Sequence, residues 1–130
     1  MIRFAKSSFA LLSLAALGIA LPACSSSSSS PTETLPTTLD LEVYAVAGLK
    51  FDKTSYEVAA GENFVAYVNE DTIRHNLIVA QGDTKISGFE LNVNKNGDID
   101  TGPVTLASGS YVLLCTVPGH QSMKADLTVK

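Results

Sequence analysis

Apolar and polar residues alternate along short stretches of the chain, which is the pattern of half-buried β-strands. Glycines interrupt these stretches, as turn residues do, and the Asn96-Gly97 pair predicts a β-hairpin within residues 89–106. The pattern predicts strands within residues 39–51 with a break at Gly48, 55–69 with a turn at Gly61, 75–80, 89–106, 109–115 and 123–129. It predicts no helix of useful length after the N-terminal segment. Seven or eight short strands at intervals of about 8 to 12 residues indicate an all-β fold, an antiparallel Greek-key sandwich or barrel.

The first 24 residues are arranged as in a secretory signal. Arg3 and Lys6 precede an apolar run at residues 9–21, which is shorter than the roughly 20 residues that a membrane-spanning helix needs. The sequence "LPAC" at residues 21–24 is typical of a lipoprotein processing site, although Pro22 is unusual at its position. We therefore expect a signal peptide at residues 1–23 and a lipid on Cys24. The alternative is an ordinary signal followed by a chance cysteine.

Polar low-complexity sequence, "SSSSSSPTETLPTT", follows at residues 25–38. Such a composition cannot bury a core, so residues 24–38 are predicted to be a disordered tether behind the lipidated Cys24. Residues 39–130 remain as one folded domain. A tether suits an anchored domain that must reach a partner. The expected location is the bacterial cell envelope, with the exported domain facing the periplasm or the exterior.

Charge and cysteine content narrow the possible functions. The formal net charge is −4, and lysines and arginines do not cluster, which argues against a nucleic-acid partner. The chain has two cysteines, so Cys115 has no disulfide partner if Cys24 carries a lipid. Outside the cytoplasm an unpaired thiol is normally a liability. A role as a metal ligand would explain why Cys115 is present.

The segment "CTVPGHQSM" at residues 115–123 brings Cys115, His120 and Met123 close together in the sequence. His75 opens a predicted strand, and in a Greek-key fold the start of one strand and a distant loop can share an end of the sandwich. One thiolate, two imidazoles and a thioether are the ligands of type 1, or blue, copper. Zinc is disfavoured because a thioether is a poor zinc ligand and paired cysteines are absent from the sequence. A Cys-His nucleophile is disfavoured because no third residue is evident to orient it.

Two long segments of the chain resemble the cupredoxins, the small blue copper proteins of the plastocyanin/azurin type. "GLKFDKTSYEVAAGENFVAYVNEDTIRHNLIV" resembles the family's N-terminal half, and "GSYVLLCTVPGHQSMKADLTV" resembles its closing strands and ligand loop. The resemblance covers nearly all of residues 45–130. It implies one copper ion, hydrogen bonds between Asn76 and Thr116 that join the two ligand segments, and backbone N–H groups that donate to the cysteine sulfur. Two residues separate His120 from Met123 where many relatives have three or four, so Gln121 stays open as the alternative axial ligand.

These features predict a lipid-anchored single-electron carrier, and not an enzyme, that works outside the cytoplasm with one type 1 copper ion. The ring edge of His120 is the expected exit for electrons. Val117 and Pro118 are expected to form an apolar docking patch around it for a transient redox partner such as a cytochrome. One alternative is a copper-binding or trafficking lipoprotein without electron transfer, and another is a metal-free surface domain that kept the fold.

Overall fold

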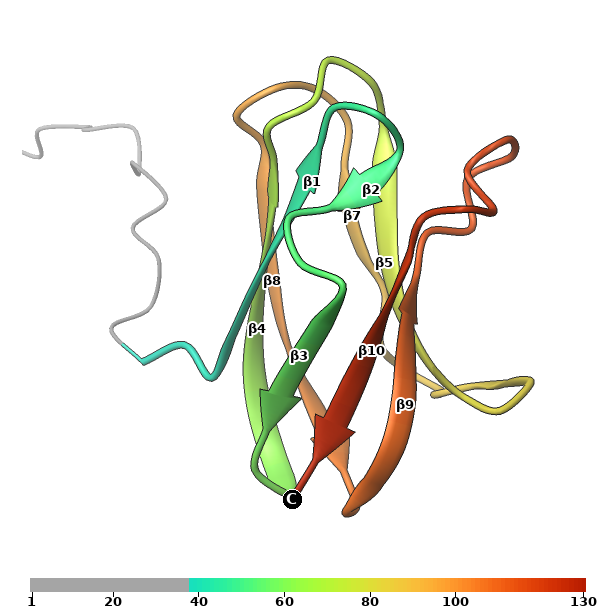
Figure 1. The fold of residues 1–130 in the computed structure, drawn as a ribbon. Coiled ribbons are helices and arrows are strands. Elements are labelled where there is room, and N and C mark those ends of the chain that lie inside the picture. The colour runs from blue at the N-terminus through green and yellow to red at the C-terminus, as the bar shows by residue number, and fades with distance from the viewer. Residues whose placement is uncertain (1–37) are drawn as a thin grey trace, which may run out of the picture. The chain divides into compact units, whose positions relative to one another are not determined.

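The computed structural model describes residues 38–130, which form a β-sandwich of ten strands (Figure 1). The strands are β1 (Leu41–Val46), β2 (Lys50–Phe51), β3 (Ser55–Val58), β4 (Gly61–Asn69), β5 (His75–Gln81), β6 (Thr84–Lys85), β7 (Leu91–Val93), β8 (Ile99–Leu106), β9 (Gly109–Leu114) and β10 (Lys124–Val129). The all-β prediction is confirmed for this part of the chain. It holds no helix that is long and apolar enough to cross a membrane.

The strands form two sheets that face each other as two layers (Figure 1). One sheet has the order β2-β1-β4-β8 and the other the order β3-β10-β9-β5-β6, with β7 also paired to β5. The pairs β1–β4 and β3–β10 are parallel, whereas the sequence pattern predicted antiparallel strands throughout. Ten strands are found where seven or eight were expected because β2, β6 and β7 are only two or three residues long. Runs that short show no recognisable alternation.

The core lies between the two sheets and follows the predicted alternation. The strand β10 alternates exposed and buried residues along its whole length. In β5, six of the seven residues are buried, which matches its uninterrupted apolar sequence and its position between β9 on one side and β6 and β7 on the other. Removal of these apolar surfaces from water is the main source of stability. His75 and Asn76 are therefore held at the start of the most deeply buried strand.

The Asn96-Gly97 turn is present, but it does not close the predicted hairpin. The N–H of Asp98 donates to the carbonyl of Lys95 at 3.1 Å, and Gly97 has a φ of 84°, which glycine adopts without steric penalty. The preceding strand β7 pairs with β5, and the following strand β8 pairs with β4. The turn therefore lies on a connection from one sheet to the other.

Three expectations concern residues outside those that the structure describes. They are the signal peptide at residues 1–23, the lipid on Cys24 and, apart from residue 38, the tether at residues 24–38. They stay predictions.

Candidate metal centre

Three neighbouring strands, β5, β9 and β10, bring the ligand segments to one end of the sandwich (Figure 1). The strand β5 begins at His75, and β9 ends immediately before Cys115. The register of β9 and β10 pairs Leu114 with Lys124, so Cys115 lies opposite Met123 one step further along. The N–H of Cys115 donates to the carbonyl of Met123 at 3.1 Å. Three of the four predicted ligands thus come from adjacent strand ends.

The pairing of β5 with β9 places Asn76 opposite Thr116. The register joins Ile78 to Leu114, and two steps further along each strand lead to these two residues. The N–H of Thr116 donates to Oδ1 of Asn76 at 2.7 Å, and Nδ2 of Asn76 donates to Oγ1 of Thr116 at 2.7 Å. The amide of Asn76 also donates to Oε1 of Glu90 at 3.1 Å. The hydrogen bonds that the resemblance implies are therefore present, and they fasten the two ligand segments to each other.

Two successive turns fold the loop after β9 back over the end of the sheet. The N–H of His120 donates to the carbonyl of Val117 at 3.0 Å, with Pro118 and Gly119 between them. Gly119 has a φ of 91°, as in a type II turn, in which proline suits the first central position and glycine the second. The N–H of Met123 then donates to the carbonyl of His120 at 2.8 Å. The Pro-Gly pair therefore fixes the backbone position of His120.

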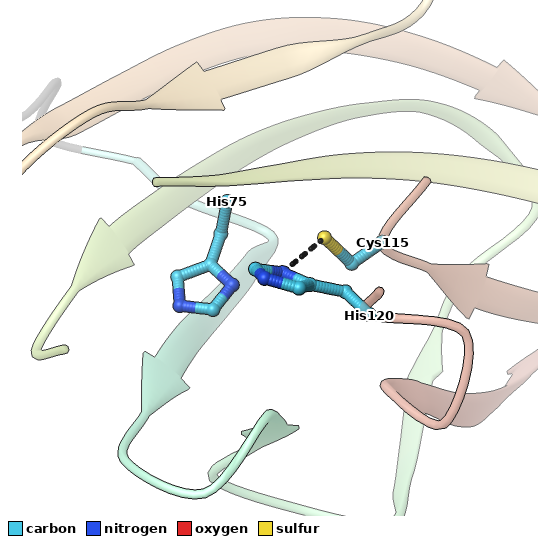
Figure 2. Close-up of side chains that lie close together, drawn as sticks. All are labelled: His75, Cys115 and His120. Atoms are coloured by element: carbon cyan, nitrogen blue, oxygen red, sulfur yellow. Dashed lines mark hydrogen bonds between the residues drawn. The ribbon is translucent and has the colours of Figure 1, made fainter. Parts of the chain in front are cut away.

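His75, Cys115 and His120 converge in a buried cluster (Figure 2). Their ligand atoms all lie within 4.8 Å of one another, and the three residues are 0%, 4% and 8% exposed. The sulfur of Cys115 lies 3.5 Å from Nδ1 of His120, and the centroids of the two imidazole rings are 4.9 Å apart. Nδ1 of His75 is buried without a hydrogen-bond partner among the described residues. Buried polar atoms rarely stay unpaired, so a bound metal ion would supply the missing partner.

The two candidates for the axial position differ in burial. Met123 is fully buried and belongs to the core cluster that also contains Cys115, whereas Gln121 is exposed. Around Cys115 itself, the polar contact that the sulfur makes within residues 38–130 is the one with His120. The backbone N–H donors to the sulfur that the resemblance implies are not found there.

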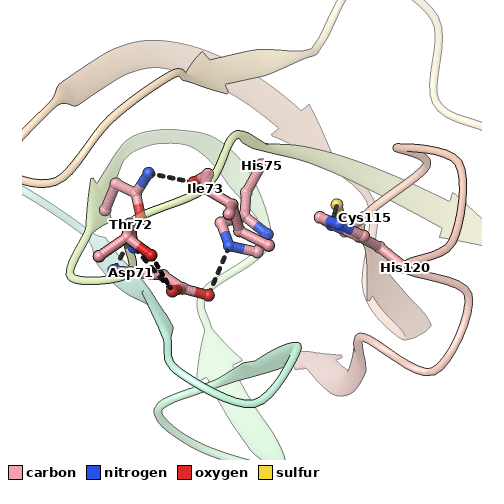
Figure 3. A network of polar contacts seen from close by, with 7 residues as sticks. Asp71, Thr72, Ile73, His75, Cys115 and His120 are labelled. Carbon is pink, nitrogen blue, oxygen red and sulfur yellow. Dashed lines mark hydrogen bonds and ion pairs between the residues drawn. The ribbon is translucent and has the colours of Figure 1, made fainter.

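Asp71, in the loop between β4 and β5, also belongs to the site, although no sequence motif predicted it. Its Oδ2 lies 3.1 Å from Nε2 of His75, on the opposite side of that ring from Cys115 and His120 (Figure 3). Its Oδ1 accepts a hydrogen bond from the backbone N–H of Thr72 at 2.7 Å. The chain has 13 acidic residues, and no sequence motif distinguishes Asp71 from the others.

The loop that carries Asp71 is braced by the last residue of β4. The side chain of Asn69, which is 1% exposed, accepts a hydrogen bond from the N–H of Asp71 at 2.8 Å. Its Nδ2 donates to the carbonyl of Ile73 at 2.8 Å. These bonds hold the carboxylate of Asp71 in place beside His75.

The electrostatic environment favours the ligand-ready forms of the side chains. Burial lowers the pKa of His120, and His75 and Arg74 lower it further against an opposing effect of Asp71. The neutral imidazole, which is the form that binds metal, is therefore favoured. The pKa of Asp71 is also lowered, chiefly by the hydrogen bond from the N–H of Thr72, with burial opposing and His75 assisting. Asp71 is therefore an acceptor-only carboxylate.

The donor set fits copper. One thiol sulfur and two imidazoles, closely spaced and shielded from water, combine the soft and borderline ligands of type 1 copper sites. Structural zinc sites instead use four strong ligands, and usually several cysteines. In the part of the chain that the structure describes, Cys115 is the free cysteine. His75, Cys115 and His120 are thus positioned to bind one metal ion, and their chemistry points to copper.

Three solved structures share this fold. Auracyanin A, a "blue" copper protein from the green thermophilic photosynthetic bacterium Chloroflexus aurantiacus, is 23% identical, with a TM-score of 0.59 over 68% of this chain and 96% of auracyanin A. An azurin (Az-iso2) from the obligate methylotroph Methylomonas sp. strain J is 15% identical, with a TM-score of 0.55 over 68% of this chain and 95% of the azurin. Auracyanin B is 23% identical, with a TM-score of 0.55 over 73% of this chain and 92% of its own.

Sequence comparison identifies the family directly. A search of curated proteins finds no match. The sequence profile of copper-binding proteins of the plastocyanin/azurin family, however, matches residues 38–130, which are all the residues that the structure describes. The chain therefore belongs to the plastocyanin/azurin family of copper-binding proteins, the cupredoxins.

Proposed function

We propose that this protein is a single-electron carrier, and not an enzyme, that holds one type 1 copper ion. The observation that carries the proposal is the convergence of His75, Cys115 and His120, whose ligand atoms lie within 4.8 Å of one another in a buried cluster. Copper held by such ligands alternates between Cu(I) and Cu(II). The protein would hold the ligands in fixed positions and shield them from water during this change of oxidation state.

Rigidity of the ligand segments supports electron transfer over copper delivery. The segments of His75 and Cys115 are joined by the paired hydrogen bonds of Asn76 and Thr116, and Cys115 is bonded through its backbone to Met123. A site that moves little when its metal changes charge exchanges electrons with little reorganisation. A delivery module would instead need ligands that release the metal readily, and buried ligands whose segments are joined by hydrogen bonds do not favour release.

Met123 is the proposed weak axial ligand. It is fully buried and lies opposite Cys115 in the strand register, whereas Gln121 is exposed to solvent. A thioether is a soft ligand that suits a long, weak axial bond in type 1 sites. Burial thus favours Met123 over Gln121 despite the short spacing to His120.

The proposed exit for electrons is His120, the most exposed of the three clustered ligands at 8%. Pro118 is exposed on the same loop, and Val117 packs partly against the core. Val117 and Pro118 form the proposed docking patch, which a redox partner such as a cytochrome would contact transiently.

The proposed location is the bacterial cell envelope, with a lipid on Cys24 as the membrane anchor. Support comes from the sequence alone, because "LPAC" is followed directly by the polar segment at residues 25–38. A lipid anchor would keep the carrier close to membrane-bound redox partners while the tether lets the domain reach them. Metabolic fatty-acid labelling tests this: the wild-type protein and a Ser25→Ala control should take up label, and Cys24→Ala should not. An unlabelled wild-type protein would refute the anchor.

Absorption spectroscopy with Cu(II) tests the electron-carrier proposal. The protein should turn blue or green, because a thiolate beside two imidazoles gives intense charge-transfer absorption, and Cys115→Ser should lose the colour. Repeated reduction and reoxidation should bleach and restore the colour without loss of copper to a chelator. A colourless wild-type complex would overturn the proposal. Release of copper on each reduction would favour the copper-trafficking alternative.

A further inference from the structure

Asp71 and the pair of Cys115 and His120 lie on opposite sides of the His75 ring (Figure 3). Nε2 of His75 faces Oδ2 of Asp71 at 3.1 Å, while the other ring nitrogen, Nδ1, is buried and unpartnered among the described residues. The two side chains are 0% and 11% exposed, so bulk water competes little for this contact. The carboxylate thus contacts the ring nitrogen that is not needed for the metal.

The number of donors around Asp71 calls for a carboxylate. Oδ1 accepts the N–H of Thr72 at 2.7 Å, and Oδ2 is within hydrogen-bond distance of Nε2 of His75. An amide side chain would offer one oxygen and one NH₂ group, so either the N–H of Thr72 would face another donor or Nε2 of His75 would have to be the acceptor, with the ring proton on Nδ1. With a carboxylate, both donors are satisfied only if His75 carries its proton on Nε2. This tautomer leaves the lone pair of Nδ1 free.

We propose that Asp71 is a positioning residue of the copper site, which holds His75 in the tautomer with a free Nδ1 and makes its imidazole a stronger ligand for Cu(II). This inference rests on the proposed copper function and deepens it. A carboxylate behind a ligating histidine orients the ring and raises its donor strength. Stronger donation and a nearby negative charge both favour the more highly charged Cu(II). Asp71 therefore lowers the reduction potential of the bound copper.

The fixed position of the carboxylate makes this effect specific to Asp71. Asn69 accepts the N–H of Asp71 at 2.8 Å and donates to the carbonyl of Ile73 at 2.8 Å, which closes the loop around the carboxylate. The neighbouring carboxylate of Glu70 is exposed and makes no hydrogen bond or ion pair with His75 among the described residues. Loss of either acidic group removes one charge near the site, but only loss of Asp71 removes the contact with the ring.

The first experiment needs no copper. Nitrogen-15 NMR of the metal-free, full-length wild-type protein should show the Nε2–H tautomer of His75. Asp71→Asn should lose this tautomer wholly or in part, and the control Glu70→Gln should keep it. A wild-type protein in the Nδ1–H tautomer would overturn the inference, whatever the variants do.

The second experiment compares copper-loaded proteins. Asp71→Asn should bind Cu(II) about 10- to 100-fold more weakly, as is typical when the partner of a ligating histidine is removed. Each tenfold loss of Cu(II) affinity relative to Cu(I) affinity raises the potential by about 59 mV. Glu70→Gln should change this affinity ratio by much less than tenfold, and Asp71→Glu, which restores a carboxylate, should recover part of the loss.

The outcomes separate this inference from the function on which it rests. If the wild-type protein forms no coloured copper complex, the proposed function fails. If the wild-type protein is coloured and Asp71→Asn keeps both its potential and its His75 tautomer, the role of Asp71 fails while the copper function stands. If Asp71→Asn does not fold, two measurements still test the role of Asp71. One is the tautomer of His75 in the wild-type protein, where an Nδ1–H form overturns the role. The other is the reduction potential of Asp71→Glu.

Discussion

Replacement of Asn76 by alanine tests the link between the two ligand segments. Asn76 is 6% exposed and makes three side-chain hydrogen bonds, two with Thr116 at 2.7 Å each and one with Glu90 at 3.1 Å. A hydrogen bond between neutral groups contributes about 0.5 to 1.5 kcal/mol net, and one to a charged group contributes more. Thr116 is exposed, so water replaces part of what is lost. We expect Asn76→Ala to lower the free energy of unfolding by about 2 to 3 kcal/mol.

A double-mutant cycle isolates the contact with Thr116. Thr116→Val removes the hydroxyl acceptor but keeps the backbone N–H that donates to Asn76. This single change should lower the free energy of unfolding by about 1 kcal/mol. Because the two side chains are in direct contact, the double mutant should lose less than the sum of the single losses. The coupling energy should be about 1 kcal/mol.

Urea denaturation of the metal-free, reduced protein is the assay, because bound copper would add its own binding free energy. A loss of about 2 kcal/mol lowers the urea midpoint by about 0.7 to 2 M at the slopes of about 1 to 3 kcal/mol/M that are typical of small proteins. Asn63→Ala is the matched control, since Asn63 is 3% exposed and donates to the carbonyls of Ala59 and Gly61 at 2.9 and 3.2 Å.

The control should lose stability but keep the copper charge-transfer band, whereas Asn76→Ala should weaken or shift that band. The reasoning would be refuted by a loss under about 0.5 kcal/mol for Asn76→Ala. A coupling energy near zero, with an unchanged band, would refute it as well.

Three further predictions test other parts of the domain. Tyr67→Phe should raise the free energy of unfolding by about 1 kcal/mol because the buried Tyr67 hydroxyl has no hydrogen-bond partner among the described residues. Tyr56→Phe should lower the free energy of unfolding because the Tyr56 hydroxyl donates to Asp52 at 2.6 Å. Thermal denaturation measures both changes, and effects of the same sign would contradict the reasoning. Met123→Leu should keep the copper colour and raise the reduction potential, since an apolar axial position favours Cu(I); an unchanged potential and spectrum would move the axial role to Gln121 if Gln121→Ala altered both. Gly119→Ala should lower the free energy of unfolding by about 1 kcal/mol or more because Gly119 has a φ of 91°, and Gly119→Asn should lower it less in the same measurement.

The longer strands could be predicted from the sequence because their information is local. Alternation of buried and exposed residues is complete in β3 and β10, and the apolar run in β5 reflects burial on both faces. Strand pairing depends on which distant segments of the chain meet. The alternation of apolar and polar residues within one strand carries no information about this. The parallel pairs β1–β4 and β3–β10 could not be seen for this reason. The short strands β2, β6 and β7 exist only because a longer neighbour offers them backbone partners.

The turn at Asn96-Gly97 shows the same division between local and distant information. The positive φ of Gly97 is a local requirement that the residue type reveals. The hairpin inferred from it was wrong, because β7 finds its partner in β5 and β8 finds its partner in β4. A turn signal thus predicts where the chain bends, and burial against the rest of the core decides which strands then meet.

Only part of the metal centre could be predicted from the sequence. For the metal centre, the signal is the rarity of certain residue types and not the periodicity of apolar residues. Cysteine and histidine are scarce in this chain, with two of each, so Cys115, His75 and His120 stand out in the sequence without knowledge of their positions in space. Asp71 is one of 13 acidic residues and acts through a contact that exists only because the loop after β4 folds back on the start of β5. The candidate metal ligands can therefore be recognised from the sequence. The group that we propose adjusts its potential is defined by geometry alone, so cupredoxins with the same ligands can differ in potential without any change in their ligand motif.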